Sequence, residues 1–229
     1  MATGRWSFSG EVCEVFEDHI RRSVPGYDAL HELVVSYGLR KVNKENALIC
    51  ELGSSTGTLT RRLASALPWA QVLGVELEAR MVAAAERFSP PSSEISYLCA
   101  DARVFEPPRT DLFVACYTLQ FLPVQERLPL LQRLYEALKP GGSLFLAEKV
   151  TRENAKDERR ARRELSDFKR GQGFTDAEIR AKSKSLEGVL VSLPETTYPR
   201  WLISVGFTKV ERVFDTATFV AWTAVKREQ

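Results

Sequence analysis

The stretch C50-E-L-G-S-S-T-G-T-L-T-R-R-L-A64 limits the possible folds of this chain more than any other. An apolar run at 47–52 meets five small residues at 53–57, and a helical pattern follows at once. Glycines at positions 53 and 57 let the backbone turn sharply and approach a ligand without an intervening Cβ. The helix that follows points its first amides at the same place. This order of elements is typical of a nucleotide-type ligand site, although the turn alone does not say which ligand.

The same alternation of strand and helix continues along the chain. Strands are expected at 47–52, 71–76, 95–99, 112–116 and 143–148, with helices at 57–66, 78–88 and 123–138. Such alternation predicts a parallel sheet covered on both faces. The last two expected strands, 209–214 and 217–225, are so close in sequence that they form a hairpin, and the final strand runs antiparallel. We therefore predict an α/β, Rossmann-like sheet of seven strands, in which a C-terminal hairpin closes five parallel strands.

Two helical segments flank this alternation. Residues 1–46 contain an expected helix at 9–22 and a second one after Tyr27, and they form an N-terminal helical cap. Residues 150–205 contain expected helices at 153–170, 175–185 and 196–205, and they form an insertion before the hairpin. The 229 residues suit one domain. Because a parallel sheet leaves its ligand open on one side, we expect the cap and the insertion to cover it.

Composition excludes several classes of protein. The net charge of +2 gives no global field that favours nucleic acid, so no direct nucleic-acid binding is expected. The four cysteines are scattered and only two histidines occur, so no metal site is expected. Cys50 and Cys99 lie in strand-like runs and are predicted to be buried thiols. Neither a signal peptide nor a membrane span is visible, which predicts a cytoplasmic protein.

Although the net charge is small, charged residues are distributed unevenly along the chain. Residues 152–170 hold eight Lys or Arg against five Asp or Glu. One interpretation is a solvated helix face with many ion pairs, and the other is a docking site for an anionic partner.

Acidic residues stand at three successive strand ends, where open α/β sheets bind their ligands. Glu76 ends the second strand and can accept hydrogen bonds from ribose hydroxyls. Asp101 follows the third strand and can accept from an adenine amino group, while Glu51 can bind a ligand ammonium or brace the turn. Together they suit a ligand with adenosine at one end and an amino acid at the other, which is S-adenosylmethionine. A nicotinamide dinucleotide fits less well, because the spacing is G-x-x-x-G rather than G-x-G-x-x-G and Ser55 adds bulk between the glycines.

Several longer motifs are more specific than the glycine turn. They include V15-F-E-D18, R22-S-V-P-G-Y27, T118-L-Q-F-L122, E148-K149, D167-F-K-R170 and L186-E-G-V189. With these motifs the chain resembles class I S-adenosylmethionine-dependent methyltransferases and, more narrowly, the carboxy-S-adenosylmethionine synthase family. The resemblance runs from W6-S-F8 to the final strand.

The resemblance implies a cofactor, a reaction and a set of site residues. Members of that family use prephenate to carboxylate S-adenosylmethionine, and the product serves modification of the tRNA wobble uridine. The family pattern also implies a homodimer. By this resemblance the cofactor site comprises Tyr27, Gly53, Ser54, Ser55, Glu76, Leu77, Asp101 and Ala102. The glycine turn and the strand ends add Glu51, Gly57 and Cys116 to the expected cofactor residues.

Two departures from the family pattern bear on the chemistry. Cys116 stands where the family has an Asn, which replaces a strong hydrogen-bonding amide with a weak donor. Ser183 stands where the family has an Arg that pairs with the carboxylate of the carboxylated cofactor. Serine cannot supply that charged, bidentate contact. We therefore predict an enzyme that transfers the ordinary methyl group. A true carboxy-S-adenosylmethionine synthase and a non-catalytic cofactor-binding protein remain the alternatives.

The acceptor is expected to be a small molecule, and an anionic acceptor would suit the basic residues of the insertion. Methyl transfer needs alignment and exclusion of water more than a catalytic triad, so no catalytic residue is assigned. Tyr27, Tyr117 and Phe121 are candidates for aromatic contact with the cation. If the acceptor requires a base, Glu148, His31 and Tyr198 are the candidates. The expected substrate residues are Lys182, Ser183, Lys184, Tyr198 and Arg200, with Arg170 as a further cation.

Overall fold

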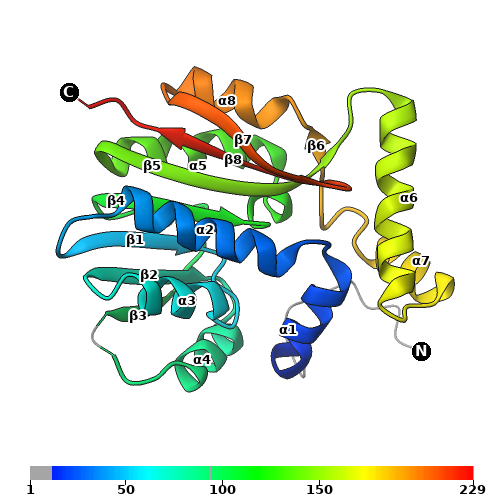
Figure 1. Cartoon of the computed structure of the whole chain (residues 1–229), viewed down its shortest axis with the longest axis horizontal. Helices are drawn as coiled ribbons and strands as arrows, with labels where there is room; N and C mark the ends of the chain where they lie inside the picture. The colour runs from blue at the N-terminus through cyan, green and yellow to red at the C-terminus, as the bar shows by residue number, and fades with distance from the viewer. Residues whose placement is uncertain (1–11, 93, 229) are drawn as a thin grey trace.

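A mixed sheet forms the centre of the computed structural model, which describes residues 12–92 and 94–228 (Figure 1). Its strand order is β3-β2-β1-β4-β5-β8-β7. Neighbours among β1 to β5 pair in parallel, and β8 runs antiparallel to both β5 and β7. This confirms the predicted five parallel strands and closing hairpin. The strands are β1 (Ala47–Leu52), β2 (Ala70–Glu76), β3 (Ile95–Cys99), β4 (Thr110–Cys116), β5 (Leu138–Thr151), β7 (Thr208–Thr216) and β8 (Phe219–Val225).

An eighth strand was not predicted. β6 (Leu193–Pro194) has two residues and pairs in parallel with the end of β5. So short a strand carries no alternation of apolar and polar residues, so the sequence gives no signal for it.

Helices cover both faces of the sheet. On one face, α2 (Tyr27–Lys41) and α3 (Thr58–Ala66) bury their apolar residues in one cluster with Phe145 and Ala147 of β5. On the other, α5 (Val124–Ala137) and α8 (Thr197–Val205) bury theirs with Leu146 and Trp222. The helix α4 (Ala79–Phe88) contacts β2 and β3. Both faces are therefore apolar, as expected for parallel strands.

Three helices lie at the end of the sheet to which the parallel strands point: α1 (Val12–Ser23), α6 (Ala155–Gly171) and α7 (Asp176–Ser185) (Figure 1). The expected capping box is present, because Thr175 and Glu178 cap α7 reciprocally. Of the two predicted covering segments, only these helices lie over the strand ends, since α2 and α8 pack on the sheet. The W6-S-F8 motif lies outside the described residues.

The charge run at 152–170 forms ion pairs along α6. Exposed pairs join Arg160 to Asp157, Arg162 to Glu158 and Arg170 to Asp167. Pairs of this kind, three or four residues apart on a helix, add little stability and keep the surface solvated. The solvated-face interpretation accounts for these arginines without a partner, and it also removes Arg170 from the site.

Tyr198 is a core residue, which corrects its prediction as a substrate residue. Its side chain is fully buried between α8 and the sheet, with its ring centroid 5.6 Å from that of Trp222. Its hydroxyl accepts a hydrogen bond of 3.0 Å from Nη1 of Arg127, which is also fully buried. Local sequence could not show this, because the hydrogen-bond partner lies 71 residues away.

Cys99 is exposed, contrary to the prediction, whereas Cys50 is buried as predicted. Both lie in strands, but β3 is at the edge of the sheet and β1 is in its middle. An edge strand has a neighbour on one side only, so a strand-like sequence does not ensure burial.

Tyr198→Phe should lower the free energy of unfolding by about 1.5–3 kcal/mol, the usual contribution of a hydrogen bond to a charged group. The dissociation constant for S-adenosylmethionine should stay unchanged, because Tyr198 lies in the core. Urea unfolding and calorimetry measure the two quantities. Tyr135→Phe is the control, since no described group hydrogen-bonds its hydroxyl. A loss of cofactor or acceptor binding at full stability would contradict the assignment of Tyr198 to the core.

Candidate functional site

Backbone conformation and close contacts both restrict which residues the turn between β1 and α3 can contain. Gly53, Ser55 and Gly57 all have left-handed backbone conformations, with φ of 73°, 50° and 79°. A Cβ on Gly53 would lie 2.4 Å from Oγ1 of Thr118, which donates a 2.7 Å hydrogen bond to the carbonyl of Leu52. A Cβ on Gly57 would lie 2.2 Å from the hydroxyl of Tyr97. Both glycines are therefore required by close contacts as well as by φ.

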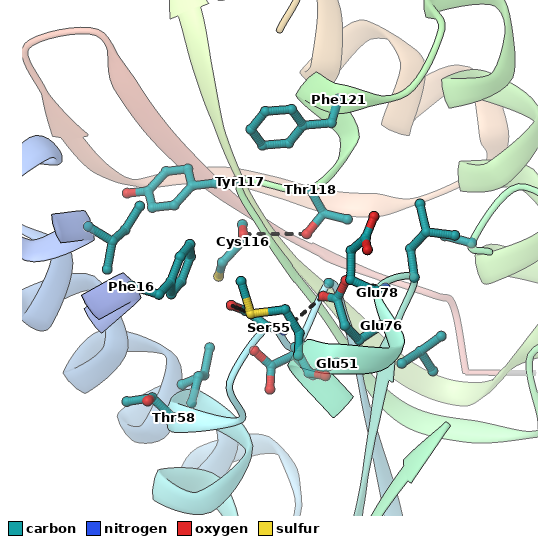
Figure 2. A pocket seen from close by; sticks show the side chains of 18 of the residues that line it. Phe16, Glu51, Ser55, Thr58, Glu76, Glu78, Cys116, Tyr117, Thr118 and Phe121 are labelled. Atoms are coloured by element: carbon teal, nitrogen blue, oxygen red, sulfur yellow. Dashed lines mark hydrogen bonds between the residues drawn. The ribbon is translucent and has the colours of Figure 1, made fainter. Parts of the chain in front are cut away.

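Glu76 is held against this turn by two backbone amides. Its carboxylate accepts hydrogen bonds from the N–H of Ser55 at 2.9 Å and from the N–H of Glu78 at 3.0 Å (Figure 2). A carboxylate has about four acceptor positions, so it retains capacity for ligand hydroxyls. Glu76 lines a cavity of about 260 Å³ at this end of the sheet. The structure thus places the predicted ribose-binding carboxylate at the cavity and in a fixed orientation.

Glu51 lines the same cavity from the end of β1 and is only 4% exposed. It accepts a hydrogen bond from Oγ1 of Thr60. Burial raises its pKa to about 8. Glu51 has a contact with α3 that braces the turn, and it also faces the cavity. A cation bound there would favour the ionised carboxylate.

Asp101 lines the cavity from beyond β3. Its carboxylate is held by Arg103, whose Nε lies 2.8 Å from Oδ2 and whose backbone N–H lies 2.8 Å from Oδ1. The hydrogen bond from Arg103 lowers the pKa of Asp101, although partial burial opposes it. Asp101 is therefore an ionised acceptor at neutral pH, as its predicted role requires.

The cavity lining has a marked charge composition. Among the described residues it includes five carboxylates and no Lys or Arg. It also has aromatic side chains from four parts of the chain (Figure 2). The carboxylates are Glu17, Glu51, Glu76, Glu78 and Asp101, and the aromatic residues are Phe16, Tyr27, His31, Tyr117, Phe121 and Phe219. This lining favours a cation over an anion.

Some lining residues were not predicted as site residues. Glu17 of α1 lines the cavity and accepts a 2.9 Å hydrogen bond from Oγ1 of Thr56 and another from Thr58. Phe16 precedes it, and both belong to the V15-F-E-D18 motif, which was the available signal. Phe219 belongs to the final strand and has no signal of this kind. It enters the site because β8 lies beside β5.

Cys116 and Tyr117 continue the lining where β4 ends. Burial raises the pKa of the Cys116 thiol well above its usual value, so it is protonated and inert. Tyr117 has a left-handed backbone with φ of 62° and a buried hydroxyl without a hydrogen-bond partner. Its ring packs edge-on against Phe219, with centroids 5.2 Å apart. A strained, unsatisfied residue in a cavity wall is typical of a ligand site.

The candidate bases His31 and Glu148 differ in whether they line the cavity. His31 lines the cavity, but burial and the nearby Arg62 lower its pKa to about 3, so it is neutral and a weak base. Glu148 is fully buried and accepts hydrogen bonds from the N–H groups of Leu119 and Gln120 at 2.8 and 2.9 Å. It therefore positions the 3-10 turn Leu119–Phe121 and does not line the cavity.

The predicted cofactor residues converge and the predicted substrate residues do not. Tyr27, Gly53, Ser54, Ser55, Leu77, Ala102 and Cys116 line the cavity with the three predicted carboxylates, and Gly57 shapes the turn behind it. Lys182, Ser183, Lys184 and Arg200 do not line it. Ser183, Lys184 and Arg200 are exposed, and Lys182 is half-buried on α7. Neither α7 nor α8 contributes a residue to the cavity lining, so the side chains of both helices lie away from it.

Within residues 12–92 and 94–228, no three His, Cys, Asp or Glu side chains gather as metal ligands would. No helix in the same ranges is long and apolar enough to span a membrane.

Comparison with known proteins identifies the family. A methyltransferase domain model matches residues 49–142. The carboxy-S-adenosyl-L-methionine synthase of Wolinella succinogenes is 31% identical over 229 residues, which cover 98% of this chain and 95% of that protein. The synthase of Shewanella baltica is 32% identical and covers 96% and 93% of the two chains.

Solved structures agree on the fold. Magnesium protoporphyrin IX methyltransferase from Synechocystis with bound SAH has a TM-score of 0.68 at 15% identity, covering 96% of both chains. An N-methyltransferase from Bradyrhizobium japonicum in complex with S-adenosyl-l-homocysteine has a TM-score of 0.62 at 18% identity, covering 92% of this chain and 91% of that one.

These likenesses confirm the predicted fold and the predicted cofactor class. The chain has the class I S-adenosylmethionine-dependent methyltransferase fold and belongs to the carboxy-S-adenosyl-L-methionine synthase family.

Proposed function

We propose that this chain is a methyltransferase that passes the methyl group of S-adenosylmethionine to a small acceptor. The observation that carries the proposal is the charge of the cavity. Its described lining has five carboxylates and several aromatic faces, and none of its side chains is Lys or Arg. A sulfonium cation suits such a lining, whereas a cofactor with an additional carboxylate would be buried there without a charged partner.

The residues present fit the cofactor. Glu76 would accept from the ribose hydroxyls, since two fixed amides orient it and acceptor positions remain. Asp101 would accept from the adenine amino group, and Glu51 would pair with the ammonium group. Gly53 gives the close approach of backbone that such a ligand needs.

When bound, the cofactor supplies a methyl carbon activated by a sulfonium. The protein's contribution is alignment and exclusion of water. Phe16 and Phe121 close the cavity from α1 and from the turn after β4 (Figure 2). The ring of Tyr117 also lines the cavity, and its hydroxyl is buried without a hydrogen-bond partner.

A second candidate function is supported by a specific observation. The curated relatives, 31% and 32% identical over nearly the whole chain, are named carboxy-S-adenosyl-L-methionine synthases. Against it stands position 183, where the family's carboxylate-binding Arg is Ser. Ser183 is exposed on α7. The homodimer implied by the family stays a prediction, and light scattering of the purified protein tests it.

Protein purified from its host should carry S-adenosylmethionine or its demethylated product, because no cation in the described lining can pair with an added carboxylate. Mass spectrometry of the ligand released on denaturation measures this. Incubation with S-adenosylmethionine and prephenate should leave the cofactor mass unchanged.

Carboxylated cofactor in either sample would contradict methyl transfer and support the second candidate. Absence of any ligand, together with no heat of binding on titration with S-adenosylmethionine, would instead point to a protein that kept the fold without the cofactor.

Glu76→Ala should weaken S-adenosylmethionine binding by about 1.5–3 kcal/mol, because ribose hydroxyls lose a charged acceptor. Calorimetry measures the change and thermal unfolding confirms that the variant folds. Glu86→Ala is the control, since Glu86 is exposed on α4 and does not line the cavity. Wild-type affinity in a folded Glu76→Ala protein would remove Glu76 from the site.

A further inference from the structure

The segment between β3 and β4 forms the side of the cavity that is proposed to bind adenine, yet it has no helix or strand of its own. Residues 100–109 form only turns and irregular backbone. Three of them, Ala100, Asp101 and Ala102, line the cavity. Because irregular backbone lacks a regular hydrogen-bond ladder, contacts from other elements must fix the conformation of this segment.

The two ends of the turn at residues 100–105 are attached to the rest of the protein. At the first end, the N–H of Ala100 donates a 2.9 Å hydrogen bond to the carbonyl of Glu76. At the other end, the side chain of Phe105 is buried in the core beneath α5. Residues 101–103 lie between these two attachments and need a further contact, since they belong to neither a strand nor a helix.

Arg133 of α5 supplies that contact. One nitrogen of its guanidinium, Nη2, donates hydrogen bonds to the carbonyl of Ala102 at 2.8 Å and to the carbonyl of Arg103 at 2.7 Å. Its Nε is buried and has no hydrogen-bond partner. A buried unpaired donor is unfavourable, so the guanidinium is placed for the two carbonyls and not for its own full pairing.

The contact with Arg103 extends to Asp101. The backbone N–H of Arg103 lies 2.8 Å from Oδ1 of Asp101, and its Nε lies 2.8 Å from Oδ2. With Nη2 of Arg103, three donors meet a carboxylate that has about four acceptor positions, so about one position remains for a ligand. Arg133, Arg103 and Asp101 therefore form one chain of contacts from α5 to the cavity.

The same helix holds a second part of the cavity lining in a similar way. Arg127 is fully buried, and its Nη2 donates to the carbonyls of Gln120 at 3.1 Å and Leu122 at 3.0 Å. Gln120 and Leu122 line the cavity. Because α5 packs firmly on the sheet through its leucines, it can serve as a rigid support for both segments.

We propose that Arg133 is a positioning residue for adenine recognition. It holds Ala102 and Arg103 so that the carboxylate of Asp101 faces the amino group of the base. This rests on the role of Asp101 in the proposed function, and it applies whichever group the cofactor transfers. A fixed carboxylate distinguishes adenine from hypoxanthine, because hypoxanthine has a carbonyl oxygen, an acceptor, where adenine has its amino donor. A displaced or mobile carboxylate loses this discrimination.

Calorimetry with S-adenosylhomocysteine and S-inosylhomocysteine tests the proposal without turnover. The two ligands differ only in this group of the base. We expect wild-type protein to bind the adenosine compound about tenfold more tightly or better, and Arg133→Met to lose most of this preference. Arg109→Met is the matched control and should keep the wild-type ratio. Arg109 also joins the segment to α5, through the carbonyl of Glu136 at 3.3 Å, but it is exposed and does not line the cavity.

A conservative variant and a local measurement complete the test. Arg133→Lys keeps the charge and much of the stem but not the planar guanidinium, so we expect a ratio between those of wild type and Arg133→Met. It carries the comparison if thermal unfolding shows that Arg133→Met does not fold. Hydrogen exchange of residues 100–108 in ligand-free protein should be faster in the Arg133 variants than in Arg109→Met.

Three outcomes would overturn the role of Arg133: no preference for the adenosine compound in wild-type protein, a wild-type ratio in the folded Arg133 variants, or an equal loss in Arg109→Met. Asp101→Asn separates this proposal from the proposed function. If Asp101→Asn loses the preference and the Arg133 variants keep it, only the role of Arg133 is wrong. If Asp101→Asn keeps the preference, the assignment of Asp101 to adenine is wrong, and the role of Arg133 with it. Carboxylated cofactor in the mass spectrum would contradict methyl transfer alone.

Discussion

The backbone of Gly53 and the side chain of Thr118 meet where β1 and β4 end, and the cofactor side of the site depends on this contact. Thr118 reaches the carbonyl of Leu52, and the space it occupies excludes a side chain on Gly53. The turn is then held from its other side by Glu76, through the amide of Ser55. A ligand over this turn meets backbone and carboxylates that are already in position, which lowers the ordering cost of binding.

The charge of the cavity lining is the property that most limits its ligand. The described lining includes five carboxylates and several aromatic rings, and none of its side chains is Lys or Arg. A cationic ligand suits such a lining, whereas an additional carboxylate on the ligand would meet no cation among the described lining residues.

The cofactor residues could be predicted because they follow strands. A carboxylate at a strand end is carried to the same edge of a parallel sheet whatever the helices do, so Glu51, Glu76 and Asp101 converge as expected. The substrate residues could not be predicted in this way. Tyr198 was assigned to the acceptor, but its helix packs on the sheet and its hydroxyl pairs with Arg127.

The sequence alone determined the features that follow from single segments of the chain. These are the glycine turn, the three acidic strand ends, the closing hairpin and the family resemblance. These depend on local patterns of period two and on positions along single strands. Only the tertiary structure decided which residues lie beyond the cofactor. Cys99 became exposed because β3 is an edge strand, and Phe219 reached the cavity because β8 inserts beside β5. Contacts between segments far apart in sequence leave no periodic signal, because each side chain's surroundings are set by the packing of other elements.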